Sequence, residues 1–378
     1  MSDREVYQKF IEWLGSTWWG LPESDELMPL IMARYTREEA ALLTGIPFSG
    51  RNLEELAGMK QAEPAELATR LDSLARKGVV FRSVEGDTVR YSLNDSFFVL
   101  LRSAFWHGRA DKVSRAMAPL INRYFYHGFF DQYADVHTKG LRTLPIEGTI
   151  DDARRILPYE DVVKVLNNQD YFCVATCPCR HRKNLDPDSP DCEHPTENCL
   201  HFGQLARYMV EQGLGREITR EETHGILTQA AKSGLVHGVS NWLEGVDTIC
   251  NCCKCCCMWF EGFHVLHHSE SLDASNYRVH TNPDTCEGCG LCVKRCPMEA
   301  LRLEASPEAD NKTGKVAGLE PELCIGCGVC AYECPTKSLV LVRRGVTTDP
   351  PRNMLEYGMR FMADNQAARG RLGQTEAK

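Results

Sequence analysis

Two stretches toward the C-terminal end each carry four cysteines in the same pattern. They read CEGCGLCVKRCP (286–297) and CIGCGVCAYECP (324–335). In both, the cysteines are separated by two, two and three residues, and a proline follows the last one. Three thiolates at two-residue intervals can bind three corners of one cubane iron–sulfur cluster. Zinc also takes four thiolates and is the alternative, but two matched runs that both end in Cys-Pro favour iron–sulfur clusters.

The repeated pattern resembles that of the bacterial dicluster ferredoxins, which hold two 4Fe-4S clusters. In that family the fourth cysteine of each run binds the cluster of the other run. The resemblance implies two ligand sets: Cys286, Cys289, Cys292 and Cys334 for one cluster, and Cys324, Cys327, Cys330 and Cys296 for the other. It also implies one-electron transfer as the chemistry of this module, which we expect to span residues 276–345.

The densest group of cysteines precedes this module, in CNCCKCCC (250–257). Thiols without metal would oxidise readily at this density, whereas a bound metal deprotonates thiols and fixes them in place. Zinc sites usually space their cysteines by two to four residues, so adjacent cysteines favour a centre with several irons. We expect at least one further iron–sulfur cluster, shared with an earlier loop. The expected ligands are Cys177, Cys179, Cys192, Cys199, Cys252, Cys253, Cys256 and Cys257.

The earlier loop contains CPCR at 177–180. Cys177 and Cys179 would lie on the same side of an extended segment, because alternate residues of a strand share a face. With Cys192 and Cys199 they make four thiols, enough for another cubane. Cys173, in the apolar YFCVA, is expected to be an inert core residue. The basic residues 180–183 (RHRK) would offset the charge of a thiolate cluster, hold an anionic substrate, or form a solvated loop.

The combination of CPCR, CNCCKCCC and a dicluster module resembles a poorly characterised group of 4Fe-4S binding proteins from anaerobes. The likeness spans residues 140–345 and implies further clusters, but no particular reaction. Adjacent cysteine pairs also occur in the noncubane sites of heterodisulfide-reductase-type proteins, where glycine follows each pair. Here Lys254 follows Cys253 and Met258 follows Cys257, so this second resemblance is partial.

The composition is that of a globular chain, with 378 residues, 25% of them charged and 43% hydrophobic. No stretch is apolar enough to span a bilayer, and the first residues lack the pattern of a signal peptide. Nineteen cysteines without an export signal indicate metal ligands in a reducing compartment, so we expect a cytoplasmic protein. The net charge of −9 makes nucleic acid an unlikely main partner, because phosphate binding depends on Lys and Arg.

The elements that must position these cysteines predict an α+β fold with several domains. In residues 1–105, Thr36 and Asn52 each begin a helix, Pro64 lies in the first turn of a third, and residues 79–93 form a hairpin. This arrangement resembles a winged-helix domain. Residues 106–265 are expected to be a helical, cysteine-rich, cluster-binding domain whose cysteines lie on loops between helices. Residues 346–378 are expected to form a C-terminal helix and tail.

The first hypothesis for function is an electron-transfer protein, or the electron-carrying subunit of an oxidoreductase complex. Low-potential electrons would pass between the ferredoxin clusters and the central cluster, with a flavoprotein or reductase subunit as the redox partner. The second hypothesis is a reductase whose central cluster has an open coordination site for a small substrate. The third is a redox-sensing regulator that repositions the winged helix. The N-terminal domain would dock a partner, or a second copy in a homo-oligomer.

Overall fold

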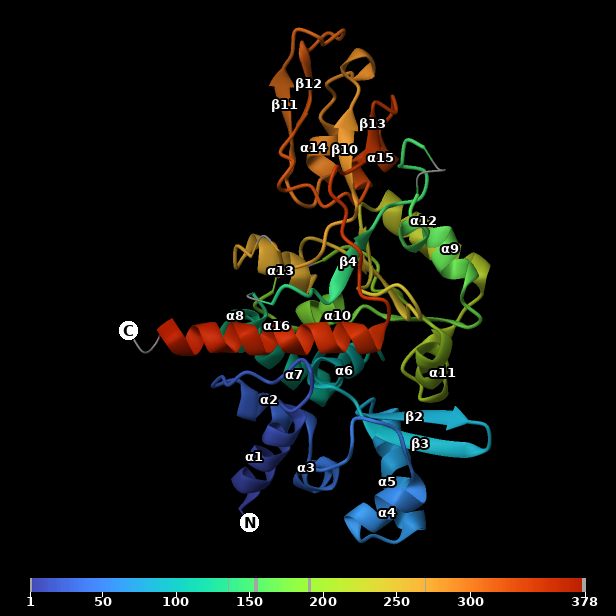
Figure 1. Ribbon diagram of the computed structural model, residues 1–378, viewed down its shortest axis with the longest axis vertical. Helices are drawn as coiled ribbons and strands as arrows, with labels where there is room; N and C mark the ends of the chain where they lie inside the picture. Colours follow the sequence, from blue (N-terminus) through green and yellow to red (C-terminus); the bar gives the residue numbers. More distant parts are fainter. Residues whose placement is uncertain (1, 135, 153–155, 190–191, 269, 376–378) are drawn as a thin grey trace.

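The computed structural model describes residues 2–134, 136–152, 156–189, 192–268 and 270–375. It is a mixed α+β structure built from several parts. The N-terminal helices lie at one end of the long axis and a part built on a large sheet lies in the middle (Figure 1). The module with the two matched cysteine runs lies at the other end (Figure 1).

The N-terminal part contains the helices and the hairpin that the sequence predicts. Its helices are α1 (Asp3–Leu14), α2 (Leu27–Arg34), α3 (Arg37–Leu43), α4 (Leu53–Lys60) and α5 (Pro64–Arg76). Thr36 and Asn52 form capping boxes at the starts of α3 and α4, because their side chains accept backbone N–H groups that the first turn leaves open. The strands are β1 (Arg51–Asn52), β2 (Val80–Glu85) and β3 (Thr88–Leu93), in the order β1-β3-β2. The winged-helix resemblance stays a prediction.

A helical layer connects this part to the middle of the molecule. Its elements are η1 (Phe98–Arg102), α6 (Ser103–Phe105), α7 (Lys112–Tyr124), η2 (Phe125–Phe129) and α8 (Phe130–Tyr133). Trp19 packs on this layer, with its ring centroid 5.8 Å from that of Phe129 and 5.9 Å from that of Tyr133. One hydrophobic core extends from Val6 to Phe361. The expected domain boundary at residue 105 therefore does not divide two separate cores.

The middle part is built on a six-stranded antiparallel sheet. In sheet order its strands are β4 (Leu141–Leu144), β8 (Val236–Ser240), β9 (Thr248–Cys252), β6 (Glu197–Phe202), β5 (Phe172–Thr176) and β7 (Arg216–Glu217). The expectation of a helical scaffold with all cysteines on loops is wrong, because Cys173, Cys199, Cys250 and Cys252 lie on strands. Short apolar runs do not by themselves distinguish a strand from a helix, so the sequence pattern missed this sheet.

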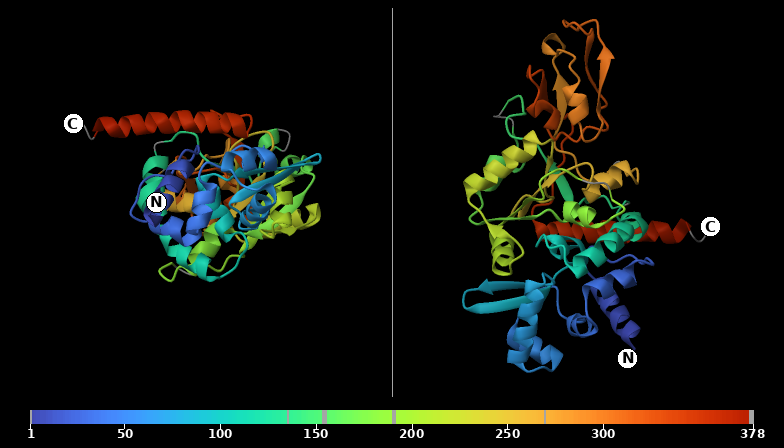
Figure 2. Two further views of the ribbon diagram at one scale, coloured as in Figure 1. Left: turned by 90° about the horizontal axis from the view of Figure 1, so that it is seen from below. Right: turned by 180° about the vertical axis from the view of Figure 1, so that it is seen from behind.

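Helices cover the sheet and connect its strands (Figures 1 and 2). They are η4 (Pro158–Glu160), α9 (Val162–Asn167), α10 (Pro178–Leu185), α11 (Gly203–Glu211), α12 (Arg220–Lys232) and α13 (Met258–His264). Thr219 and Glu222 form a capping box at the start of α12. Two of these helices, α10 and α13, begin within the two cysteine-rich segments.

The module at the far end contains two antiparallel strand pairs. They are β10 (Tyr277–Thr281) with β13 (Leu339–Arg343), and β11 (Leu301–Ala305) with β12 (Lys315–Leu319). Its short helices are η5 (Pro283–Thr285), α14 (Leu291–Arg295) and α15 (Val329–Tyr332). Glycines with φ of 72° and 82°, Gly290 and Gly328, precede α14 and α15. Glycine adopts this left-handed conformation without steric cost, so each cysteine run can turn sharply into its helix.

The C-terminal helix α16 (Met354–Thr375) is found within the segment where a helix was expected. It crosses one face of the middle part (Figures 1 and 2). Its Phe361 ring packs on Trp19, with 4.6 Å between the ring centroids, so both ends of the chain meet in one core. None of the described helices is long and apolar enough to cross a membrane.

Candidate metal centres

The eight cysteines of the end module form two groups of four. Burial, followed by the neighbouring thiols of Cys286, Cys289 and Cys334, raises the pKa of Cys292 to about 11. Cys334 thus lies with three cysteines of the other run. A bound metal would displace the protons of these four thiols.

The second group has the reciprocal composition. Burial, followed by the thiols of Cys296 and Cys324, raises the pKa of Cys327 to about 12. Cys330 lies near Cys327, Cys296 and Cys324 and also near Cys292 of the first group, so the two groups adjoin. Each group therefore takes three thiols from one run and the fourth from the other. This placement supports the crossover ligand sets, which stay a prediction for the metal-loaded protein.

A close backbone contact fixes the second cysteine run on β10. Gly326, between Cys324 and Cys327, has φ of 67°. A Cβ atom there would lie 2.1 Å from the carbonyl oxygen of Tyr277, which is far inside van der Waals contact. Only glycine therefore fits this position while the run keeps its present path.

Four cysteines of the middle part form a compact set, which we call the outer thiol group. Its members are Cys192, Cys253, Cys255 and Cys256, whose sulfur atoms all lie within 4.8 Å of one another. The Sγ atom of Cys192 is 3.9 Å from that of Cys253 and 3.4 Å from that of Cys255. Cys253 and Cys256 are buried, whereas Cys255 is exposed. Four thiols at this separation fit a metal or a cubane cluster.

Cys255 was not among the cysteines expected to bind metal. The sequence placed Cys192, Cys253 and Cys256 among the ligands but gave no basis for choosing within CKCCC. Residues 253–257 form a turn between β9 and α13, and this turn directs Cys255 toward Cys192. The turn sets the direction in which each thiol points. The alternation of side chains along a strand, on which the sequence prediction relied, does not apply to a turn.

Five further cysteines form a chain of thiol contacts, and together with the neighbouring Cys177 we call them the inner thiol group. Its members are Cys177, Cys179, Cys199, Cys250, Cys252 and Cys257. Contacts run from Cys199 to Cys250, from Cys250 to Cys252, from Cys252 to Cys257 and from Cys257 to Cys179. A chain of this kind covers a wider surface than one metal ion, so it fits a centre with several irons.

Local structure explains why these thiols converge. Cys250 and Cys252 share one face of β9, because alternate strand residues point the same way. Cys177 and Cys257 are the N-cap residues of α10 and α13. The pKa of Cys257 is lowered to about 5, because hydrogen bonds from Cys179 and Cys252 and from backbone N–H groups outweigh the effect of burial.

The four thiols of the earlier loop, Cys177, Cys179, Cys192 and Cys199, are not all in one group. Cys192 belongs to the outer thiol group, whereas Cys199 contacts Cys250 in the inner one. The extended segment expected at Cys177-Pro178-Cys179 is also wrong, because α10 begins at Pro178 and Cys179 lies in its first turn. Proline at the first helical position favours this start, a signal that the sequence offered.

The basic run after Cys179 is buried, which overturns its interpretation as a solvated loop. Arg180 and Arg182 are fully buried, and Lys183 nearly so. Arg180 donates from Nε to the sulfur of Cys253 at 3.4 Å. Burial alone would lower the pKa of Arg180, but the thiolates of Cys177 and Cys253 raise it above its usual value. Arg180 thus supplies positive charge between the two thiol groups.

Cys173 lies in an apolar cluster on β5 and is fully buried. Burial raises its pKa to about 12, so the thiol is neutral at ordinary pH. Ala175, Tyr208 and Met209 belong to the same cluster. Its Sγ atom lies 3.6 Å from the carbonyl oxygen of Val174, and Cys173 belongs to neither thiol group, which agrees with a core residue.

Comparison with known proteins identifies the end module. A family model described as a 4Fe-4S dicluster domain matches residues 285–338. This part of the chain is a 4Fe-4S dicluster domain. Ferredoxin-1 of Caulobacter vibrioides is 39% identical over 44 residues, which is 12% of this chain and 38% of that protein. A mitochondrial pyruvate dehydrogenase (NADP(+)) of Euglena gracilis is 26% identical over 92 residues, which is 20% of this chain and 5% of that protein.

These matches cover a small part of each chain, since this protein spans 5% and 38% of the two relatives. They support two 4Fe-4S clusters in the dicluster domain and an electron-transfer role for that domain. The outer thiol group is a candidate site for a further cluster.

Proposed function

We propose that this chain is an iron–sulfur electron-transfer protein, or the electron-carrying subunit of an oxidoreductase complex. The dicluster domain would exchange low-potential electrons with a third centre held by the outer thiol group. When bound, iron–sulfur clusters supply one-electron transfer, and the chain's own residues hold the sites in contact. The proposed ligands in the domain are the crossover sets that its two groups of thiols support.

The observation that carries this proposal is the contact between the dicluster domain and the outer thiol group. Lys254 lies between Cys253 and Cys255 and forms an ion pair with Glu299, three residues after Cys296. His264, at the end of α13, donates to the carbonyl oxygen of Pro297 at 2.8 Å. The segment after Cys296 is therefore held directly against the segment that carries the outer thiols.

Packing supports the same connection. Cys253 and Cys256 of the outer thiol group are buried in one apolar cluster with Ala230 of α12. Arg295 of α14 donates to the carbonyl oxygens of Ala231 and Lys232 at 2.9 and 3.0 Å, which fixes the domain on α12. The outer thiol group and the dicluster domain therefore both contact α12, which holds the two sites in a fixed relation.

The proposed partner is a redox protein such as a flavoprotein or reductase subunit. Cys289 is exposed on the dicluster domain, so electrons could enter or leave near it. The N-terminal part, with α3 to α5 and the β1-β3-β2 sheet, is proposed as a winged-helix-like docking module for that partner or for a second copy. All nineteen cysteines are free thiols, which fits a reducing compartment such as the cytoplasm.

Iron and sulfide quantification on protein purified without oxygen tests the proposal. The variant that carries both Cys253→Ser and Cys255→Ser should lose about four irons, because two of four ligands are gone. Its dicluster signals in electron paramagnetic resonance (EPR) after dithionite reduction should remain. The Cys173→Ser variant, changed at a buried cysteine outside both groups, is the control and should keep all its iron. Unchanged iron in the double variant, or zinc in place of iron, would refute the third centre.

A further inference from the structure

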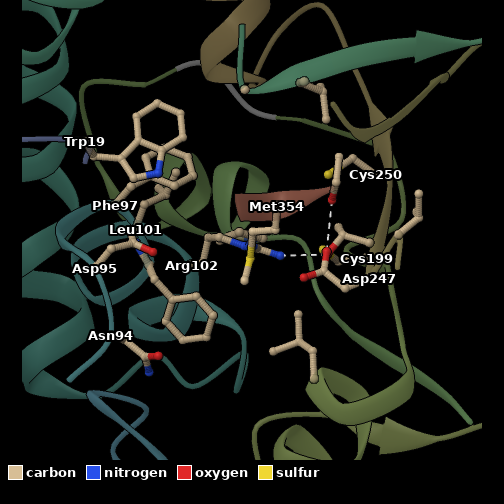
Figure 3. Close-up of a pocket in the computed structure, with 18 of the residues that line it drawn as sticks. Trp19, Asn94, Asp95, Phe97, Leu101, Arg102, Cys199, Asp247, Cys250 and Met354 are labelled. Carbon is tan, nitrogen blue, oxygen red and sulfur yellow. Dashed lines mark hydrogen bonds between the residues drawn. The ribbon is translucent and has the colours of Figure 1, made fainter. Parts of the chain in front are cut away.

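A cavity of about 1010 Å³ lies beside the inner thiol group. Cys199 and Cys250 line one side, Trp19 and Phe97 line the other, and Met354 lies between them (Figure 3). Sites for small organic molecules usually measure about 300–1,000 Å³, so this cavity is large enough for one.

The wall opposite the thiols comes from segments without cysteine, since no cysteine precedes residue 173 or follows residue 334. A metal centre held by the inner thiol group would therefore occupy one end of the cavity only. The other end is lined by N-terminal residues and by α16. It is available to a second molecule that would contact that centre.

The lining favours flat rings. The rings of Trp19 and Phe97 are stacked, with centroids 4.8 Å apart and an interplanar angle of 24°. Trp242 and Trp259 line the same cavity. Aromatic side chains gain from stacked or edge contacts with another ring system, in addition to the burial of apolar surface.

The charged side chains of the lining already have partners. Arg102 donates to the hydroxyl oxygen of Thr248 at 2.8 Å and lies 4.9 Å from the ring centroid of Trp106. Asp95 accepts from the backbone N–H of Phe98 at 2.9 Å. Burying a further charge without a new partner is costly, so these two positions do not favour a charged ligand.

The other charged residues of the lining are also engaged. Asp247 accepts from the hydroxyl of Ser240 at 2.9 Å, and Glu244 pairs with Arg352 at 2.9 Å. Arg180 contacts the sulfur of Cys253. Besides the Glu244–Arg352 pair, the lining carries two arginines and two aspartates, so its charges balance without a charged ligand.

We propose that this cavity binds a flat, uncharged aromatic molecule beside the inner thiol group. The inference goes beyond the proposed function, whose third centre is held by the outer thiol group, and adds a ligand site beside the inner thiol group.

Isothermal titration calorimetry of the oxidised, metal-loaded full chain with 2-naphthol tests the inference. We expect saturable one-to-one binding. The carboxylate 2-naphthoate, which has the same rings and a charge, should bind at least about tenfold more weakly because its charge finds no partner. Absence of saturable 2-naphthol binding, or equal affinity for both probes, would overturn the inference.

Two matched variants of α16 locate the site. Met354 lines the cavity and is 51% exposed, so Met354→Trp should obstruct the cavity without disturbing the core and should weaken 2-naphthol binding about tenfold. Met359 is 53% exposed on the same helix and does not belong to the lining, so Met359→Trp should bind like the unaltered chain. Equal affinities of the two variants would overturn the location. Binding of 2-naphthol to the oxidised protein requires no electron transfer. A result that refutes the third centre would therefore count against the proposed function and leave this binding test unaffected.

Discussion

Arg182 donates a hydrogen bond of 2.6 Å to Glu261, and both side chains are buried. Arg182 belongs to α10, whose first turn holds Cys179, and Glu261 belongs to α13, whose N-cap is Cys257. Lys183 forms an ion pair with the same carboxylate. Burial alone would raise the pKa of Glu261, but Arg182 and Lys183 lower it, so the carboxylate stays ionised. This pair sets the spacing of the two helices that bring Cys179 and Cys257 together.

The first prediction concerns this buried pair. Glu261→Gln would remove the negative charge and leave two buried cations without compensation. Breaking a buried pair in this way costs about 3–5 kcal/mol of folding free energy. Urea unfolding of the metal-loaded chain should show that loss as a lower midpoint.

The control for this prediction is an ion pair at the surface. Glu320 pairs with Arg302 at 3.0 Å, and both side chains are well exposed. Solvent screens such a pair, so Glu320→Gln should leave the unfolding midpoint unchanged. Equal shifts in the two variants would show that Glu261 contributes no more than a surface carboxylate.

The second prediction separates the crossover ligand sets from sequence-local ones. Cys296→Ser combined with Cys327→Ser should lose about four irons, because both residues would serve one cluster. Cys296→Ser combined with Cys289→Ser should lose about eight, because the two residues would serve different clusters. Iron analysis and dithionite-reduced EPR spectra measure the difference. If the first combination lost twice as much iron as the second, each run would bind its own cluster.

Features that depend on residues close together in the sequence could be predicted from it, whereas features that depend on contacts between distant residues could not. The dicluster runs and the helix starts at Thr36 and Asn52 depend on residues a few positions apart, and the sequence predicts them. The burial of Arg182 depends on Glu261, which is distant in the sequence, so local polarity suggested a solvated loop instead. The membership of Cys255 in the outer thiol group depends on a turn whose shape no short motif specifies.

The third prediction tests how the dicluster domain is held on the middle part. Arg295 donates to the carbonyl oxygens of Ala231, Lys232 and Val329. Arg295→Ala should remove these bonds and increase amide hydrogen exchange at the end of α12, while the iron content stays the same. The neighbouring Lys294 is exposed, so Lys294→Ala is the matched control and should leave exchange unchanged. Unchanged exchange in both variants would show that other contacts suffice to hold the domain.

The fourth prediction tests whether the N-terminal part is integral to the fold. Trp19 is 9% exposed and packs on Phe97, Phe361 and Trp259. Trp19→Ala should lower the free energy of unfolding by about 3–5 kcal/mol, because it leaves a cavity between three parts of the chain. Met32 is 53% exposed, and Met32→Ala should change that energy by less than about 0.5 kcal/mol. A small effect of Trp19→Ala would favour a separable N-terminal domain.

The last prediction concerns the approach of the second cysteine run to β10. Gly326→Ala would place a Cβ atom 2.1 Å from the carbonyl oxygen of Tyr277 and 2.3 Å from the hydroxyl oxygen of Ser275. The backbone cannot move away freely, because Ser275 donates to the carbonyl oxygens of Ile325 and Gly326. The φ of 67° at this position adds strain for any residue with a Cβ atom. We therefore expect displacement of Cys324 and Cys327 and a loss of about four irons, with the other cluster of the domain retained.

Gly345→Ala is the control, because a Cβ atom there has no neighbour within 4 Å. A full complement of iron in the Gly326→Ala variant would show that the run can bind its cluster along a different path.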